Sequence, residues 1–64
     1  MHLTIGDLVR YVGSGAKIQQ DYGSEDLAVV KVNATCMTVC QNQQGDLLIG
    51  ARCKDLEVIE RNSY

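Results

Sequence analysis

Short stretches of apolar and β-branched residues alternate along the chain with turns rich in Gly, Asn and Asp. Each stretch has the length and residue types of a β-strand. A polar segment before the last stretch, residues 52–56, fits a single 3₁₀ turn. The pattern therefore predicts strands at residues 7–12, 27–32, 35–41, 46–51 and 57–60.

The first two predicted strands are separated by a long connection, residues 13–26. Turn-forming residues lie at both of its ends, and the segment between them, residues 16–20, is too short to form a helix on its own. We expect a long loop that contains a turn of helix or an irregular hairpin. Connections of this length are uncommon and are often functional, so this loop is the first candidate for a binding element.

Alternation within the strands predicts which side chains face the interior. In the first strand Val9 and Tyr11 share one face, and Leu8, Arg10 and Val12 share the other. The residues expected to point inward are Val9, Tyr11, Val29, Val39, Leu47, Ile49, Leu56 and Val58. The apolar residues then left outside are Leu8, Val12, Ala28, Leu48 and Ile59. They form a contact surface for a partner or a second copy, or they are packed beneath the long loop acting as a lid.

Five short strands laid out as a flat sheet would leave one apolar face uncovered. Curling the sheet on itself gives the strands a common core and shortens the exposed edges. We therefore expect one all-β domain spanning residues 1–64, built as a small barrel.

Two segments resemble a known family. Residues 6–12 (GDLVRYV) resemble the opening strand of KOW- and Tudor-type members of the SH3-like barrel superfamily, and residues 54–59 (KDLEVI) resemble their closing 3₁₀ turn and strand. The resemblance covers nearly the whole chain as a layout. It implies a five-stranded SH3-like barrel with a long loop after the first strand and a 3₁₀ turn before the last. Barrels of this type host unrelated activities, so the resemblance predicts the fold rather than the function.

Length and composition narrow the class of function. A chain of 64 residues is one small domain and has no room for a large enclosed cleft. No Gly-rich phosphate-binding motif opens a helix, and a Cys–His nucleophile pair would have to use His2 near the terminus. We therefore expect no enzymatic activity, no catalytic residue and no cofactor. The N-terminal segment lacks the features of a secretory signal, which predicts a cytoplasmic protein with no membrane partner.

The chain contains three cysteines, Cys36, Cys40 and Cys53. The odd count argues against a disulfide framework, and Cys36 and Cys40 lie about 13 Å apart if they share one strand, which is too far for a bond. We expect buried, inert thiols. Together with His2 the cysteines make up a Cys₃His set, so a small Cys/His metal-binding protein is an alternative, although a β-branched strand is a poor zinc knuckle and we assign no metal ligand.

The predicted long loop carries acidic residues next to an aromatic one. Asp21, Tyr22, Glu25 and Asp26 are the candidate contacts, because loop acids steer a basic partner and a tyrosine supplies contact area at low entropic cost. The sequence therefore predicts a non-catalytic protein–protein interaction or regulatory module. It would bind a protein partner, or associate with itself, through this loop and the adjacent strands.

An alternative is a nucleic-acid-binding protein, because KOW-type members of the family bind RNA or ribosomal surfaces. Arg52 and Lys54 are the neighbouring bases that would make the contacts. Eight acids against six bases give a net charge of −2, and the bases are scattered along the chain, which disfavours this alternative. It remains open at this point.

Overall fold

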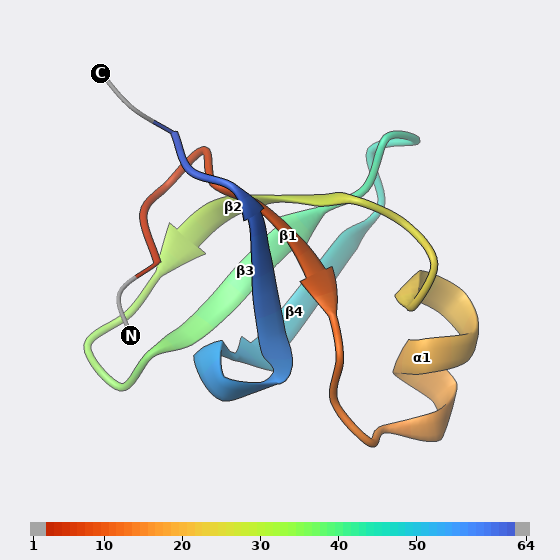
Figure 1. Ribbon diagram of the computed structural model, residues 1–64. Helices are drawn as coiled ribbons and strands as arrows, with labels where there is room; N and C mark the ends of the chain where they lie inside the picture. Colours follow the sequence, from red (N-terminus) through yellow and green to blue (C-terminus); the bar gives the residue numbers. More distant parts are fainter. Residues whose placement is uncertain (1–2, 63–64) are drawn as a thin grey trace.

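In the computed structural model, which describes residues 3–62, five strands form one antiparallel sheet (Figure 1). The sheet order is β4-β3-β2-β1-β5, so β5 returns to pair with β1. The predicted strands and 3₁₀ turn are confirmed, with one helix added. The elements are β1 (Leu8–Tyr11), α1 (Ala16–Tyr22), β2 (Leu27–Val32), β3 (Met37–Gln41), β4 (Leu47–Arg52), η1 (Cys53–Asp55) and β5 (Leu56–Glu60).

The sheet is not closed into a barrel, so this part of the fold prediction is wrong. Its two edge strands, β4 and β5, follow one another in the chain and are joined by η1 alone. The 3₁₀ turn redirects the chain between them, and no ladder of hydrogen bonds forms. The core is covered instead from outside the sheet, by Ile18 and Tyr22 of α1 and by Leu3 before β1.

Three strands each contain one residue that has no partner in the neighbouring strand. These residues are Val30 in β2, Gly50 in β4 and Ile59 in β5. An extra residue of this kind is a β-bulge, which bends the strand and increases its twist. Gly50 has a φ of 87°, in the left-handed region that glycine enters without steric cost. The bulges therefore curl a sheet that is too small to stay flat.

The interior confirms the predicted faces for β1, β2 and the start of β5. Val9, Tyr11, Val29 and Leu56 are all buried, as expected. They belong to a cluster that consists of Leu3, Val9, Tyr11, Leu27, Val29, Cys40, Leu48, Ala51, Cys53 and Leu56.

In β3 and β4 the predicted faces are wrong. Leu47 and Ile49 point outward, whereas Leu48 is buried. Leu47, Leu48 and Ile49 are all aliphatic, so alternation of apolar and polar residues cannot show which of them face the core. A shift of one residue exchanges the inward and outward side chains completely. In β3 the smaller Thr38 is buried instead of Val39, because its Oγ1 donates a hydrogen bond of 2.8 Å to the Ala51 carbonyl.

The long connection between β1 and β2 is occupied by α1, so the irregular hairpin that the sequence also allowed is not present. Ile18 and Tyr22, four residues apart, share the face of α1 that packs on the core. At its N-terminal end, the Gly15 N–H donates to the Tyr11 hydroxyl at 3.0 Å. Packing therefore stabilises a helix too short to form alone. Within residues 3–62, no helix has the length and apolar character needed to cross a membrane.

The carboxylate of Asp7 ties the two ends of the described chain together. Asp7 is 1% exposed, and it accepts hydrogen bonds from the N–H groups of Asn62 (2.7 Å) and Thr4 (2.9 Å). Arg61 adds a longer ion pair at 3.9 Å. The hydrogen bond from Asn62, followed by that from Thr4, lowers the pKa of Asp7 below its ordinary value. The charged form of Asp7 therefore stabilises the fold.

Replacing Gly50 tests the bulge in β4. Gly50→Ala should lower the free energy of unfolding by about 1–2 kcal/mol, because an L side chain is strained at a left-handed position. Crowding is not the cause, since the nearest atom to an added Cβ is the Met37 Cε at 3.5 Å. D-alanine, introduced by chemical synthesis, is the matched control and should retain the wild-type value in urea unfolding. Equal stability of the glycine and L-alanine proteins would contradict the bulge.

Asp7 predicts how stability depends on pH. A lowered folded pKa gives stability that is fully present above the unfolded value, about pH 4, and is lost as the pH falls through the folded value. Asp7→Asn should therefore destabilise the protein at pH 7, and the difference from the wild type should narrow at pH 2. Asp21→Asn, at an exposed position of α1, is the control. Urea unfolding at both pH values measures the difference, and a gap that does not narrow in acid would refute the assignment.

Candidate functional site

The four residues predicted to bind a partner lie around the C-terminal end of α1, in different environments. Asp21 is exposed on the last turn of the helix. Tyr22 packs against the core, and its hydroxyl donates a hydrogen bond of 3.4 Å to the Leu47 carbonyl. The tyrosine thus attaches the helix to the start of β4 and offers a partner only part of its surface.

Glu25 and Asp26 both make contacts within the chain. Glu25 accepts a hydrogen bond of 3.1 Å from the Asn42 side chain, and Asp26 forms an ion pair of 3.1 Å with Arg10. Asn42 is held in place because its Oδ1 accepts from two N–H groups of the β3–β4 turn, those of Gln44 and Asp46. The two acids line a polar hollow of 360 Å³ with Arg10, Ser24, Gln43 and Gln44. The structure brings the two acids together at this hollow, whereas Tyr22 is not part of its lining, although the Glu25 N–H donates to the Tyr22 carbonyl at 3.2 Å.

Cys36 and Cys53 form a disulfide, with Cα atoms 5.5 Å apart, so the expectation of three reduced thiols is wrong. The bond lies one residue beyond Met37 and Arg52, the last pair of the β3–β4 ladder. The Cys53 N–H also donates to the Cys36 carbonyl at 3.0 Å. The disulfide therefore closes the open end of this hairpin. Spacing along the chain cannot reveal such a pair, because the pairing depends on the strand register.

Cys40 is the free cysteine of the described chain and is fully buried. Burial raises the pKa of its thiol, and a contact of 3.4 Å with the Thr38 hydroxyl opposes this shift to a smaller extent. The predicted burial is confirmed for Cys40, and its inertness stays a prediction.

The disulfide also bears on the metal-binding alternative. Two of the four ligands it requires, Cys36 and Cys53, are bonded to each other. The fourth, His2, lies outside the described residues. No group of three or more His, Cys, Asp or Glu side chains within residues 3–62 is arranged to hold a metal ion.

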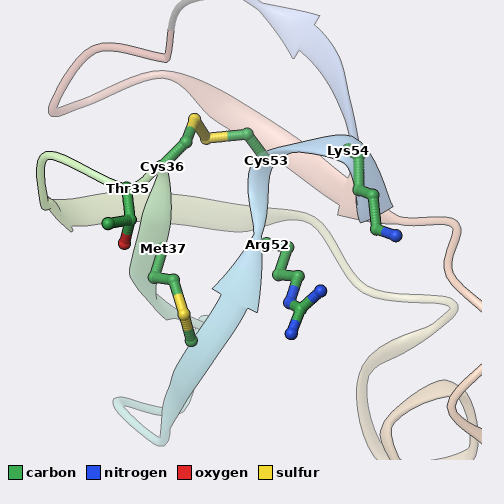
Figure 2. A pocket seen from close by; sticks show the side chains of 6 residues that line it. All are labelled: Thr35, Cys36, Met37, Arg52, Cys53 and Lys54. Carbon is green, nitrogen blue, oxygen red and sulfur yellow. A yellow bond between two sulfur atoms is a disulfide. The ribbon is translucent and has the colours of Figure 1, made fainter.

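An open groove of 740 Å³ lies beside the disulfide. Its lining consists of two tripeptides centred on the two cysteines, Thr35-Cys36-Met37 and Arg52-Cys53-Lys54 (Figure 2). The Arg52 and Lys54 side chains extend to the same side of the groove, away from the sulfur atoms. The two bases singled out in the sequence are thus brought to one site, because they flank a cysteine at the end of β4.

A second hollow, of 220 Å³, adjoins this groove and shares Met37 with it. Across the strands, Lys31 pairs with Val39 and Val39 pairs with Ile49, so these three side chains form a row on the outer surface of the sheet. Ile49 is 74% exposed, the most exposed large hydrophobic side chain of the described chain. We name this surface the basic–apolar face; it comprises Lys31, Met37, Val39, Ile49, Arg52 and Lys54.

The basic–apolar face is positively charged. It holds three of the six bases of the chain, while β2, β3 and β4 contain no Asp or Glu. The ion pairs within residues 3–62, Arg10–Asp26 and Arg61–Asp7, involve none of its cations. Alternation along the strands predicts that Val39 and Ile49 face the interior, so the sequence pattern does not reveal this face. The available signal was the absence of acids from all three strands.

No family model, curated protein or solved structure matches this chain.

The disulfide predicts a measurable gain in stability. The two cysteines are 17 residues apart, and closing a loop of about this length stabilises a protein by about 3 kcal/mol, largely by restricting the unfolded chain. Cys36→Ala/Cys53→Ala should lose this amount in urea unfolding. Wild-type protein kept in a reducing agent is the matched comparison and should unfold close to the variant. Equal stability of the oxidised and reduced wild type would exclude a stabilising role.

Proposed function

We propose that this protein is a non-catalytic interaction module that binds an acidic, extended segment of a partner protein on the basic–apolar face. The observation that carries the proposal is that exposed Ile49 and half-buried Val39 lie together there with three bases that form no ion pair within residues 3–62. Aliphatic side chains supply area to bury, and surrounding cations select and orient a negatively charged partner.

The position of β4 supports an extended segment as the occupant. β4 is an edge strand that is hydrogen-bonded to β3 alone, and it carries Ile49 and Arg52 on its outer side. A peptide that adds to such an edge gains main-chain hydrogen bonds and places alternate side chains over the face. The row of outer side chains then contributes specificity as well as area.

The predicted contacts around the end of α1 are less suitable than the basic–apolar face as the main binding surface. Tyr22, Glu25 and Asp26 already have partners within the chain, and among the predicted contacts Asp21 is the exposed one. A partner that used Glu25 or Asp26 would have to replace existing contacts. We therefore place binding on the strands next to the loop.

Nucleic acid is the second candidate, because Arg52 and Lys54 share a face with Lys31. Single-stranded nucleic acids are bound largely by stacking on aromatic side chains. Within residues 3–62, Tyr11 is buried and Tyr22 packs on the core, so neither offers a ring on this face. An aliphatic surface favours a protein.

We also infer a relationship to the SH3-like superfamily. Two features support it: β5 returns to pair with β1, and a 3₁₀ turn precedes the last strand. This relationship does not select a partner, because the fold hosts many functions.

The test uses a synthetic peptide that alternates Glu with Val and Leu, measured by fluorescence anisotropy at low salt. Ile49→Ser should weaken binding about tenfold by removing exposed apolar area. Arg52→Gln and Lys54→Gln should each weaken it about two- to fivefold and reduce its salt dependence. Lys17→Gln, on α1, is the matched control and should have no effect.

Three further measurements distinguish the acidic peptide from other possible partners. A peptide with Lys in place of Glu should not bind. Tighter binding of single-stranded RNA than of the acidic peptide would replace the protein partner with nucleic acid. A concentration-dependent dimer that Ile49→Ser abolishes would make the partner a second copy of the chain. Binding of the acidic peptide that is unaffected by all three face variants would overturn the proposal.

A further inference from the structure

The two sulfur atoms of the disulfide differ in how far their residues are exposed. Cys36 is partly exposed at the wall of the groove, whereas Cys53 is 5% exposed and belongs to the core. In thiol–disulfide exchange, the incoming thiolate must reach the sulfur that it attacks. Both cysteines line the groove, but Cys36 is the more exposed of the two, so an incoming thiolate reaches Cys36 more readily.

The groove that Cys36 lines carries positive charge on its opposite side, next to Cys53. Arg52 and Lys54 extend along one side of the groove (Figure 2), and no carboxylate within residues 3–62 forms an ion pair with either. The nucleophile in disulfide exchange is the thiolate anion. A groove lined by one sign of charge raises the local concentration of an ion of the opposite sign.

We propose that the groove is an entry site for anionic thiols, which open the Cys36–Cys53 disulfide by attack on Cys36. The incoming thiolate forms a new S–S bond with the Cys36 Sγ, and the bond to Cys53 breaks. Cys53 leaves as a thiolate and takes a proton from water. A second thiolate then attacks the sulfur of the bound reagent, which releases the oxidised disulfide of the reagent and a Cys36 thiolate. Two thiols supply the two electrons.

The surrounding backbone allows the exchange to be reversed. Cys36 has a φ of 58°, a left-handed conformation that is uncommon for a residue with a side chain. The turn that imposes it is held by Asn33, whose Oδ1 accepts hydrogen bonds from the N–H groups of Thr35 (3.0 Å) and Met37 (2.9 Å). This turn and the hydrogen bond from the Cys53 N–H to the Cys36 carbonyl do not depend on the disulfide. We expect these contacts to keep the two cysteines close enough for reoxidation.

The free cysteine takes no part in this reaction. Cys40 is fully buried, and burial raises its pKa, so its thiolate form is scarce and cannot compete for either sulfur. Exchange within the chain is thus disfavoured, and the external thiol sets the outcome.

The experiment compares the rates at which three thiols open the disulfide of the folded protein. They are mercaptoethanesulfonate (anionic), mercaptoethanol (neutral) and cysteamine (cationic), used at equal thiolate concentrations. We expect the anionic thiol to react about tenfold faster than the cationic one at low salt, with the difference shrinking as salt is added. Arg52→Gln/Lys54→Gln should remove most of the difference. Lys17→Gln, outside the groove, should retain it.

Trapping with iodoacetamide followed by mass spectrometry identifies the sulfur that is attacked. The expected product carries the reagent on Cys36 and the alkyl group on Cys53. The reverse placement, equal discrimination in the Arg52→Gln/Lys54→Gln variant, or opening in denaturant alone would overturn the proposal. The assay contains no partner, so its result is independent of peptide binding to the basic–apolar face.

Discussion

The left-handed conformation of Gly50 is the constraint on which the outer surface depends. Gly50 has no partner in β3. Side chains still alternate between the two faces before and after Gly50, but the order of the faces is reversed across it. Leu48 and Ala51, three residues apart, both enter the core, and Ile49 and Arg52 both face outward. A regular strand would send one member of each pair to the opposite face. The bulge thus places an apolar and a basic side chain of β4 on the same surface.

The disulfide fixes the other end of the same hairpin. The β3–β4 turn is organised by Asn42 at one end, and Cys36–Cys53 closes the strands at the other end. These two closures reduce the conformational entropy that the hairpin loses on folding, which a small core would otherwise have to offset in full. The basic–apolar face is therefore carried mostly by the most strongly constrained part of the sheet, although β4 is an edge strand.

Much of the fold can be predicted from local sequence, whereas the residues of the candidate site are brought together by the pairing register of the strands. Residues 27–32 were assigned correctly as a strand because β-branched residues and flanking turn residues define it without any partner. The faces of β3 and β4 were assigned wrongly because Leu47, Leu48 and Ile49 are equally apolar and a bulge cannot be inferred from alternation. The disulfide was missed for the same reason. The role of Asp7 depends on Asn62, a residue 55 positions away, which no local pattern connects to it.

The distribution of charge over the folded surface also cannot be inferred from the order of charged residues along the chain. Along the chain, acids and bases are evenly mixed, and the net charge of −2 argues against binding an acidic partner. In the folded chain, Asp21, Glu25 and Asp26 gather around the end of α1. Lys31 of β2, Arg52 of β4 and Lys54 of η1 lie on one face, and β2, β3 and β4 contain no acid. A charged partner responds to the charges within about a Debye length of its contact, about 10 Å, and not to the sum over the molecule. The acids therefore leave the basic–apolar face available to an anion, and they also discourage anions from binding elsewhere.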